Sequence, residues 1–287
     1  MEVMNGMFDL PEDHPGVHDV EYRRRRARIA EVGERWVRGE PIPDVHYSDA
    51  EHEVWATVSR ELAGRHRALA HPAYLEGAAR LDLPADRVPQ LARVDREVHA
   101  ASGFHIYPVP GLVPARDFYG DLADRVFNST QYIRHHSVPF YTPEPDIVHE
   151  IIGHAQMLAA PVFADLHQAA GTAARRCRSD EALEFFSRVF WFTLEFGVVM
   201  DGDLPKAYGA GLLSSYGELG EFRSAELRPW DLRAMGTQSY DITEYQPVLF
   251  VAPDLDFVID ELGSFFATFD DEVHARYLSS PTIRSHA

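Results

Sequence analysis

The sequence of 287 residues is poor in cysteine, in basic residues and in long apolar runs. Its single cysteine, Cys177, cannot form an internal disulfide, which fits a reducing compartment such as the cytoplasm. No stretch approaches the roughly 18 uncharged apolar residues of a membrane span, and the acidic opening segment lacks the basic and apolar regions of a signal peptide. Basic residues number 27 against 45 acidic ones, and the formal charge of -18 disfavours nucleic acid and anionic membranes as partners.

The chain does contain enough apolar material for a sizeable core. Hydrophobic residues make up 45% and aromatic residues 11% of it, which excludes a disordered chain. No internal repeat, low-complexity stretch or Gly/Ser-rich linker divides it, so a single domain over residues 1–287 is the simplest organisation. Residues 1–16 are expected to form an extended arm, and the remainder predicts a mainly α fold with small β elements.

The spacing of apolar residues predicts the individual elements. A stripe from Ile29 to Val37 places the preceding run Arg23–Arg26 on an exposed helical face, and Ser48 with Glu51 predicts a capping box before a helix whose stripe continues to Leu69. Further helices are expected near 91–98 and over 115–127, 145–159, 161–178, 180–199 and 254–269. Short strands are expected over 104–109, 131–134 and 245–251, with a flexible turn at Gly209–Gly211.

The densest chemical signal is the segment that carries His149, Glu150 and His154. It is close to the His-Glu-x-x-His motif of zinc proteases, but the second histidine follows the first by five positions instead of four. On an ideal helix such residues point about 140° apart. Both imidazoles therefore reach one metal only if the helix bends or ends locally, which Gly153 permits; a packed or solvated histidine pair is the alternative.

A third ligand candidate lies in the apolar segment 190–200, which carries one carboxylate, Glu195. A buried lone carboxylate is costly unless it is paired, protonated or bound to a metal. Two histidines and one carboxylate form the ligand set of non-haem Fe(II) oxygenases, so the pattern favours iron over zinc. A zinc hydrolase with Glu150 as general base stays the alternative from another class.

Several motifs resemble the pterin-dependent aromatic amino acid hydroxylases, the family of phenylalanine, tyrosine and tryptophan hydroxylase. They occur in the family's order within residues 103–269, and several ordered motifs are more specific than any one of them. The matching segments are Arg116-Asp117-Phe118, Arg125–Phe127, Thr130–His135, Tyr141–Ile147, His149-Glu150, Gly153-His154, Trp191–Gly197, Tyr208–Ser215 and Gln246-Pro247.

This resemblance implies cofactors and the residues that hold them. Fe(II) would be bound by His149, His154 and Glu195, and it would act with O2 and a tetrahydropterin, either tetrahydrobiopterin or a related pterin. The pterin would lie against the backbone of Gly111 and Leu112, with the Phe118 ring stacked on it and Glu150 nearby. The catalytic residues would be the three iron ligands and Glu150.

The resemblance also implies an amino acid site. Arg134 would clamp the substrate carboxylate, for which a guanidinium is well suited. The same site would be lined by Tyr141, Thr142, Gly211 and Ser214, with Ser214 orienting His149, and the ring pocket by Pro145 and Trp191. Tryptophan hydroxylases usually carry a smaller phenylalanine at the position of Trp191, so tryptophan is a disfavoured substrate.

The leading expectation is an iron- and pterin-dependent phenylalanine 4-monooxygenase that converts L-phenylalanine to L-tyrosine. The alternatives are a phenylalanine 3-hydroxylase forming meta-tyrosine, a hydroxylase of tyrosine or tryptophan, or a metal-free binding protein. Three departures from the family pattern, Phe190, Gln156 and Asn128, leave the position of attack open. The expected organisation is a single catalytic domain without a regulatory domain or a tetramerisation helix, and a monomer.

Overall fold

Helices dominate the structure, a computed structural model that describes residues 10–279. The α-helices are α1 (Val20–Arg35), α2 (Asp49–Leu69), α3 (Pro72–Ala78), α4 (Leu91–Ser102), α5 (Ala115–Ala123), α6 (Gln156–Leu158), α7 (Pro161–Ala174), α8 (Asp180–Phe190), α9 (Ala210–Ser214), α10 (Tyr216–Glu221), α11 (Leu232–Thr237), α12 (Leu255–Thr268) and α13 (Asp271–Ser279). Two π-helices, η2 (His149–Ala155) and η3 (Trp191–Glu195), and two 3-10 turns, η1 (Pro15–Val17) and η4 (Phe222–Ser224), complete them. The prediction of a mainly α fold is confirmed.

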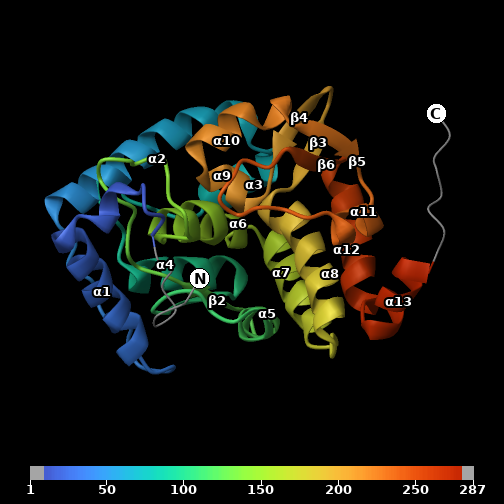
Figure 1. Cartoon of the computed structure of the whole chain (residues 1–287), viewed down its shortest axis with the longest axis horizontal. Helices are drawn as coiled ribbons and strands as arrows, with labels where there is room; N and C mark the ends of the chain where they lie inside the picture. The colour runs from blue at the N-terminus through green and yellow to red at the C-terminus, as the bar shows by residue number, and fades with distance from the viewer. Residues whose placement is uncertain (1–9, 280–287) are drawn as a thin grey trace.

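The strands form two small sheets. β1 (His105–Pro108) pairs in parallel with β2 (Val126–Ser129). The second sheet has the order β4-β3-β6-β5 and contains β3 (Val198–Asp201), β4 (Leu204–Ala207), β5 (Glu226–Pro229) and β6 (Val248–Ala252). Within it only β3 and β4 are antiparallel. Figure 1 shows this sheet at one end of α7 and α8, while β2 and α5 lie toward their other end.

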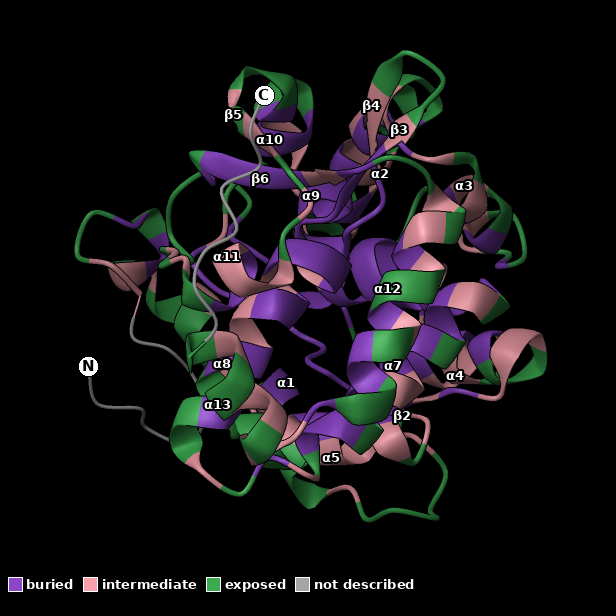
Figure 2. Ribbon diagram, turned by 90° about the vertical axis from the view of Figure 1, so that its right-hand side faces the viewer, coloured by how far each residue is buried: buried purple, intermediate pink, exposed green. Residues whose placement is uncertain are grey.

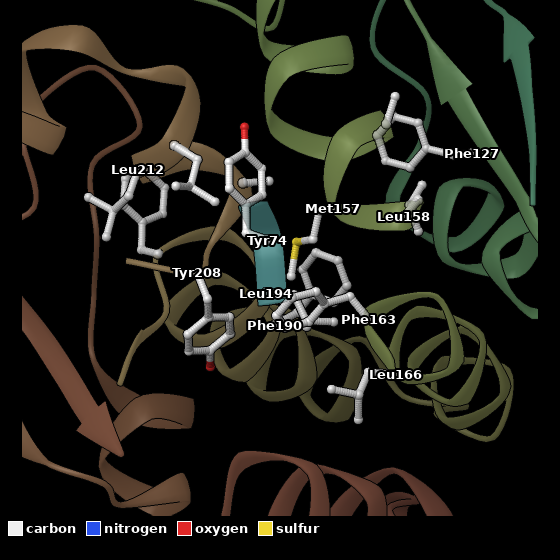
Figure 3. Packing of buried hydrophobic residues seen from close by; sticks show 14 of the residues in the cluster. Tyr74, Phe127, Met157, Leu158, Phe163, Leu166, Phe190, Leu194, Tyr208 and Leu212 are labelled. Atoms are coloured by element: carbon white, nitrogen blue, oxygen red, sulfur yellow. The ribbon is translucent and has the colours of Figure 1, made fainter. Parts of the chain in front are cut away.

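The core runs through the middle of these elements. α7 packs against both α5 and α12, and Figure 2 shows that the buried residues face inward while the outer sides of α5 and α13 are exposed. Tyr74, Met157, Phe163 and Tyr208 meet in this core (Figure 3), where the rings of Phe163 and Tyr208 stack at 5.8 Å. Full burial of each large side chain contributes on the order of 2–3 kcal/mol.

The amino-terminal helices differ in one respect from the sequence expectation. The capping box of α2 is confirmed, with the Ser48 amide donating to the Glu51 carboxylate at 2.6 Å. The prediction that the run Arg23–Arg26 is exposed is wrong for Arg26, which is buried and forms an ion pair with Glu144. The reason is helical spacing, because Arg26 shares the inward face of α1 with Ile29 and Ala30.

Several predicted boundaries are also corrected. The helix expected over 115–127 ends at Ala123, because the chain turns at Arg125, whose φ is 55°, and enters β2. The helix expected over 180–199 ends at Glu195, and Gly209–Gly211 leads into α9 instead of forming a flexible turn. Segment 131–134 is not a strand, since side chains such as Asp146 and Tyr47 satisfy its backbone groups.

The expected arm over residues 1–16 falls largely outside the described residues. From residue 10 onward the chain forms a turn and then η1, and His14 is buried, so this part is not simply extended. No helix within residues 10–279 is both long and apolar enough to cross a membrane.

Candidate active site

Both histidines of the motif lie on the π-helix η2. In a π-helix the hydrogen bonds close from residue i to i+5, so side chains five positions apart come onto one face. The Nε2 atoms of His149 and His154 accordingly lie 3.1 Å apart. The sequence had required the helix to bend or end; instead it widens by one residue per turn and continues directly into α6.

Glu195 completes the cluster as the last residue of the second π-helix, η3. One carboxylate oxygen lies 3.1 Å from His154 Nε2, and the other lies 4.0 Å from His149 Nε2. Metal bonds of about 2.1 Å at right angles place neighbouring ligand atoms about 3 Å apart. The three groups can therefore bind one ion on one side and leave its other positions open, which is the arrangement of a non-haem iron site.

Close backbone packing brings the two π-helices together. A Cβ on Gly153 would lie 2.8 Å from the carbonyl oxygen of Ala210, and a Cβ on Gly209 would lie 2.4 Å from that of Glu195. Glycine is needed at both positions because backbone occupies the space of a side chain. The role of Gly153 is thus to permit close contact with α9. The sequence had suggested a different role, a bend in the helix.

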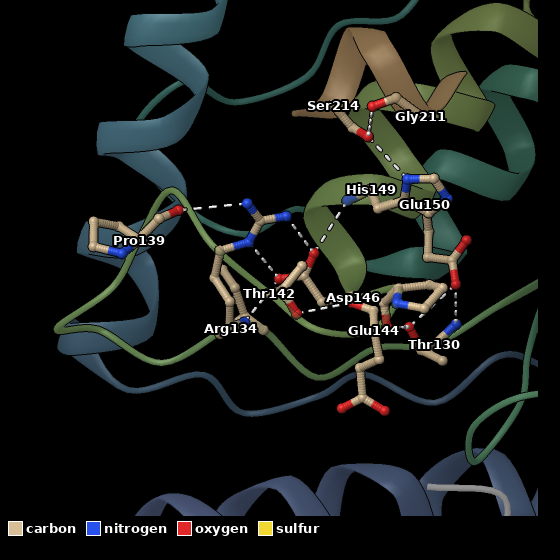
Figure 4. Close-up of polar contacts among 12 residues, drawn as sticks. Thr130, Arg134, Pro139, Thr142, Glu144, Asp146, His149, Glu150, Gly211 and Ser214 are labelled. Atoms are coloured by element: carbon tan, nitrogen blue, oxygen red, sulfur yellow. Dashed lines mark hydrogen bonds and ion pairs between the residues drawn. The ribbon is translucent and has the colours of Figure 1, made fainter. Parts of the chain in front are cut away.

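Ser214 on α9 fixes the orientation of His149. The Ser214 hydroxyl donates to the carbonyl of Ala210 at 2.9 Å, so its oxygen accepts from Nδ1 of His149 at 2.8 Å. Figure 4 shows this contact next to Gly211. With its proton on Nδ1, His149 presents an unprotonated Nε2 toward His154 and Glu195, as a metal ligand must.

Burial and mutual charge set the ionisation of the cluster. Burial alone raises the pKa of Glu195, but His154 and His149 outweigh it and hold that pKa at about 2. Burial and the neighbouring His154 lower the pKa of His149 to about 4, whereas Glu195 raises that of His154 against the effect of burial. A buried carboxylate held ionised beside a neutral imidazole is a donor set suited to a divalent cation.

Two cavities meet at the cluster. The larger, of about 410 Å³, is lined by every residue expected to bind substrate: Arg134, Tyr141, Thr142, Pro145, Trp191, Gly211 and Ser214. The smaller, of about 240 Å³, is lined by every residue expected to contact pterin: Gly111, Leu112, Phe118 and Glu150. His149 and Glu195 line both, so molecules in the two cavities would face the same ion.

Arg134, in the wall of the larger cavity, is connected to His149 through Asp146 (Figure 4). Its guanidinium forms a bidentate ion pair with Asp146 at 2.9 and 2.7 Å, and Asp146 also accepts from the His149 amide at 3.2 Å. Burial raises the pKa of Asp146, but Arg134 outweighs it and the pKa is lowered overall. The third guanidinium nitrogen, Nη1, donates to the Pro139 carbonyl at 3.4 Å, the one further hydrogen bond of this group among the described residues, and Arg134 lines the cavity.

Glu150 faces the smaller cavity. One of its carboxylate oxygens accepts from the amide and the hydroxyl of Thr130 at 3.3 and 3.2 Å. Burial raises the pKa of Glu150 to about 8, against the opposing effects of His154 and Thr130. The group can hold a proton near neutral pH at the wall where a cofactor would lie.

Sequence reasoning missed one part of the wall of the larger cavity, residues 240–245. Tyr240 stacks on Trp191 at 4.2 Å, and the Trp191 indole donates to the Gln246 side chain at 3.2 Å. The Gln246 amide in turn donates to the buried carboxylate of Glu218 at 2.7 Å. Only the motif Gln246-Pro247 indicated this part of the chain. Phe140 was missed as well.

The three departures from the family pattern lie in different places. Phe190 lines the larger cavity, and Asn128 lines the smaller one while donating to Asp121. Gln156 instead accepts from the Tyr74 hydroxyl and lines neither cavity. The sequence expectation that Gln156 shapes the substrate site is therefore corrected.

A second histidine cluster, formed by Asp19, His135 and His136, is explained without a metal. The amide of Ser137 donates to Nδ1 of His135 at 3.2 Å, which leaves the proton on Nε2. That nitrogen faces the Asp19 carboxylate at 3.3 Å and donates to it. The cluster thus links the start of α1 to the segment that lines the larger cavity.

Comparison with known proteins identifies the family. The family model described as biopterin-dependent aromatic amino acid hydroxylase matches residues 1–283. The chain belongs to this family. The hydroxylase is 49% identical over 272 residues to a phenylalanine 3-hydroxylase from Streptomyces coeruleorubidus, with 95% of this chain and 97% of the relative covered. It is 40% identical to the phenylalanine-4-hydroxylase of Rattus norvegicus, with 96% of this chain covered but only 62% of that relative.

A solved structure supports the same assignment. Phenylalanine hydroxylase from Chromobacterium violaceum with bound oxidised Fe(III) superposes with a TM-score of 0.77 at 28% identity, covering 88% of this chain and 93% of the other. The hydroxylase is thus an aromatic amino acid monooxygenase of the phenylalanine hydroxylase type, and the expectations of iron and biopterin as cofactors are confirmed. The converging atoms of His149, His154 and Glu195 fit the metal.

Glu218 gives the hydroxylase a testable pH dependence. Burial raises its pKa to about 7 from the ordinary 4.5, so between these values the folded protein holds a proton that the unfolded chain releases. Above pH 7 the charged group costs stability. Glu218→Gln keeps an acceptor for Gln246 and is expected to be more stable than the parent by about 2–3 kcal/mol at pH 8, with the advantage vanishing as the pH falls toward 4.5. Urea unfolding of both proteins from pH 5 to 8 measures this, and a pH-independent difference would contradict it.

Proposed function

We propose that this hydroxylase acts on L-phenylalanine and places the hydroxyl at the meta position, forming meta-tyrosine. The observation that carries the meta position is the 49% identity, over almost the whole of both chains, to a phenylalanine 3-hydroxylase, against 40% to the rat 4-hydroxylase. The sequence had placed attack at the para position first, and that outcome is the alternative.

The arrangement of the two cavities supports phenylalanine as substrate. We assign the amino acid to the larger cavity, with its carboxylate on the side of the Arg134 guanidinium that faces away from Asp146 and its ring between Pro145 and Trp191. The stacked pair of Trp191 and Tyr240 places two large rings in the wall of this cavity, which favours one six-membered ring over the larger indole. Residues 240–245 form part of the wall of this cavity.

The pterin is assigned to the smaller cavity. Phe118 offers a ring face for a flat heterocycle, and Gly111 lets backbone approach it closely. When bound together, Fe(II) and a tetrahydropterin activate O2 for ring hydroxylation. In this assignment His149, His154 and Glu195 hold the metal at the junction, Glu150 holds a proton beside the pterin, and Ser214 orients His149.

The position of attack depends on the wall beside the substrate ring. Phe190 lines that wall and packs edge-on against Tyr119 at 5.1 Å, so it presents an apolar surface where the family commonly has a tyrosine hydroxyl. A small rotation of the substrate ring decides whether C3 or C4 faces the metal. The shape of the cavity wall at Phe190 would therefore determine whether meta-tyrosine or para-tyrosine is formed.

The deciding experiment is a product analysis. Purified protein with Fe(II) and a tetrahydropterin in air is offered phenylalanine, tyrosine and tryptophan separately, and products are separated against ortho-, meta- and para-tyrosine. Meta-tyrosine from phenylalanine is expected. Para-tyrosine as the main product would overturn the meta assignment, and turnover of only another amino acid would overturn phenylalanine as substrate. Omission of the pterin is the control.

Arg134→Lys tests the carboxylate site. A lysine loses the bidentate geometry, so we expect the KM for phenylalanine to rise about 10-fold to 100-fold with kcat changed only several-fold, as for loss of a charged hydrogen bond of about 1.5–3 kcal/mol. Phenethylamine, which lacks the carboxylate, should lose much less affinity. Arg175→Lys, at an exposed ion pair with Asp124, is the matched control. An unchanged KM in Arg134→Lys would remove this residue from the carboxylate site.

A further inference from the structure

The two histidine ligands differ in how their second ring nitrogen is satisfied. His149 donates its Nδ1 proton to Ser214, as described above. His154 is 2% exposed, its Nε2 faces Glu195, and its Nδ1 is buried without a hydrogen-bond partner among the described residues. A histidine that binds a metal through Nε2 carries its proton on Nδ1, and such N–H groups almost always donate to an acceptor. The structure therefore contains a donor in need of an acceptor.

A second buried histidine has the complementary need. His167 lies on α7 and is fully buried, and its Nδ1 is 2.8 Å from the carbonyl oxygen of Phe163. A carbonyl can only accept, so Nδ1 carries the proton and Nε2 offers a lone pair. That Nε2 has no partner among the described residues either. A proton on Nε2 as well would add a buried N–H with nothing to receive it.

The two rings are neighbours, and the side of the pair away from His149 and Glu195 is lined by aromatic rings. Their centroids lie 6.2 Å apart at an angle of 87°, so one ring edge faces the other. The remaining ring contacts of His167 are with Phe104 and Phe190, and Phe127 packs on His154 at 4.4 Å. The imidazole of His149 also packs on His154, but its Nε2 faces Nε2 of His154 at 3.1 Å and not Nδ1. An imidazole in an aromatic pocket would be poorly placed if it served packing alone, because its polar nitrogen is not solvated there.

We propose that His167 is a positioning residue for the metal centre, accepting a hydrogen bond that originates from the Nδ1 proton of His154 and passes through one buried water, since the two nitrogens are not in direct hydrogen-bond contact. It holds the ring of His154 so that Nε2 points at the ion. Ser214 on α9 does this for His149, and His167 on α7 does it for His154, so the two ligands are oriented by residues of two different helices. The inference rests on the metal assignment made above.

Two substitutions at His167 separate this role from packing. His167→Phe keeps a planar ring but removes the acceptor, whereas His167→Gln places an amide oxygen near the position of Nε2. We expect Co(II) affinity, measured by equilibrium dialysis without substrate or pterin, to fall about 10-fold to 100-fold in His167→Phe and to stay within about threefold of the parent in His167→Gln. The visible absorption of bound Co(II) should change in the first variant and be restored in the second.

Two control variants show how large a change in Co(II) affinity each kind of defect causes. Ser214→Ala removes the acceptor of His149 and is expected to weaken Co(II) binding to a similar extent. Phe104→Leu disturbs packing on the His167 ring but leaves the polar atoms, so it should lower thermal stability without changing Co(II) affinity. Unchanged Co(II) affinity in His167→Phe would overturn the proposal, as would an equal loss in His167→Phe and His167→Gln, which would indicate packing only.

The parent protein provides a test that needs no variant to fold. The test uses protein with ¹⁵N-labelled histidine and a bound diamagnetic divalent ion. The ¹⁵N signal of His167 Nε2 should lie upfield of the signal of an unprotonated imidazole nitrogen that accepts no hydrogen bond, because this nitrogen accepts one. A free lone-pair shift overturns the inference. Failure of the parent to bind Co(II) at all would instead refute the metal assignment, so the two failures are distinguishable.

Discussion

Replacement of Glu195 by alanine is expected to lower kcat at least about 1,000-fold in the presence of Fe(II) and a tetrahydropterin. The substitution removes one of three protein donors and the only carboxylate among them. It also leaves the two Nε2 atoms, 3.1 Å apart, without the negative charge that balances a bound dication. Metal content after dialysis should fall together with turnover, and both are measured on the same sample.

Glu218→Gln is the matched control for this experiment. Glu218 is also a buried carboxylate in the wall of the larger cavity, but its partner is the amide of Gln246 and not a histidine of the cluster. Its neutralisation should leave the metal content unchanged. If Glu195→Ala retained turnover within tenfold of the parent, the ligand assignment would be wrong.

Loss of the buried ion pair on α1 should have the largest effect on stability. The Arg26 side chain is 5% exposed and its partner Glu144 is 3% exposed. The Arg26 guanidinium also lies 4.7 Å from the centre of the Tyr132 ring, whose hydroxyl donates to the other oxygen of Glu144 at 3.3 Å. Arg26→Met removes the cationic partner of this buried carboxylate, and the free energy of unfolding is expected to fall by about 3–5 kcal/mol.

Urea unfolding measures this change, and α1 itself supplies the control. Arg24, two positions away, is exposed, and Arg24→Met should alter stability by less than about 0.5 kcal/mol. Neutralising the partner as well, in Arg26→Met/Glu144→Gln, should recover part of the loss, because no buried charge is then left alone. Equal effects of Arg24→Met and Arg26→Met would contradict the assigned burial and pairing.

The metal ligands could be predicted from residue chemistry, but their convergence could not. An apolar helix with a single carboxylate indicated Glu195, and the histidine pair indicated His149 and His154. The five-residue spacing argued against a shared ion because side chains five positions apart on an α-helix point about 140° apart. Apolar periodicity does not distinguish a π-helix from an α-helix over seven residues, and the wider turn depends on the contact of Gly153 with α9.

Contacts between distant segments explain the other errors. Arg26 belonged to an arginine run that suggested an exposed face, and its burial becomes clear only from its ion pair with Glu144, which lies far from it in the sequence. The extended segment 131–134 has strand-like composition but bonds to side chains from other elements. Tyr240 and Glu218 reach the larger cavity from segments with no motif of their own, so they became visible only in three dimensions.

The paired π-helices make the length of two short segments unusually critical. Deleting one residue between His149 and His154 would give the spacing of the zinc protease motif, so a single codon separates the two. The same deletion would rotate everything beyond it by about 100° around the helix axis. Gly153 would then no longer face the backbone of Ala210, and a residue with a side chain would face it instead. We therefore expect one residue more or less to be tolerated in a loop such as the β3–β4 hairpin, whereas one residue inserted into or lost from η2 would separate the metal ligands.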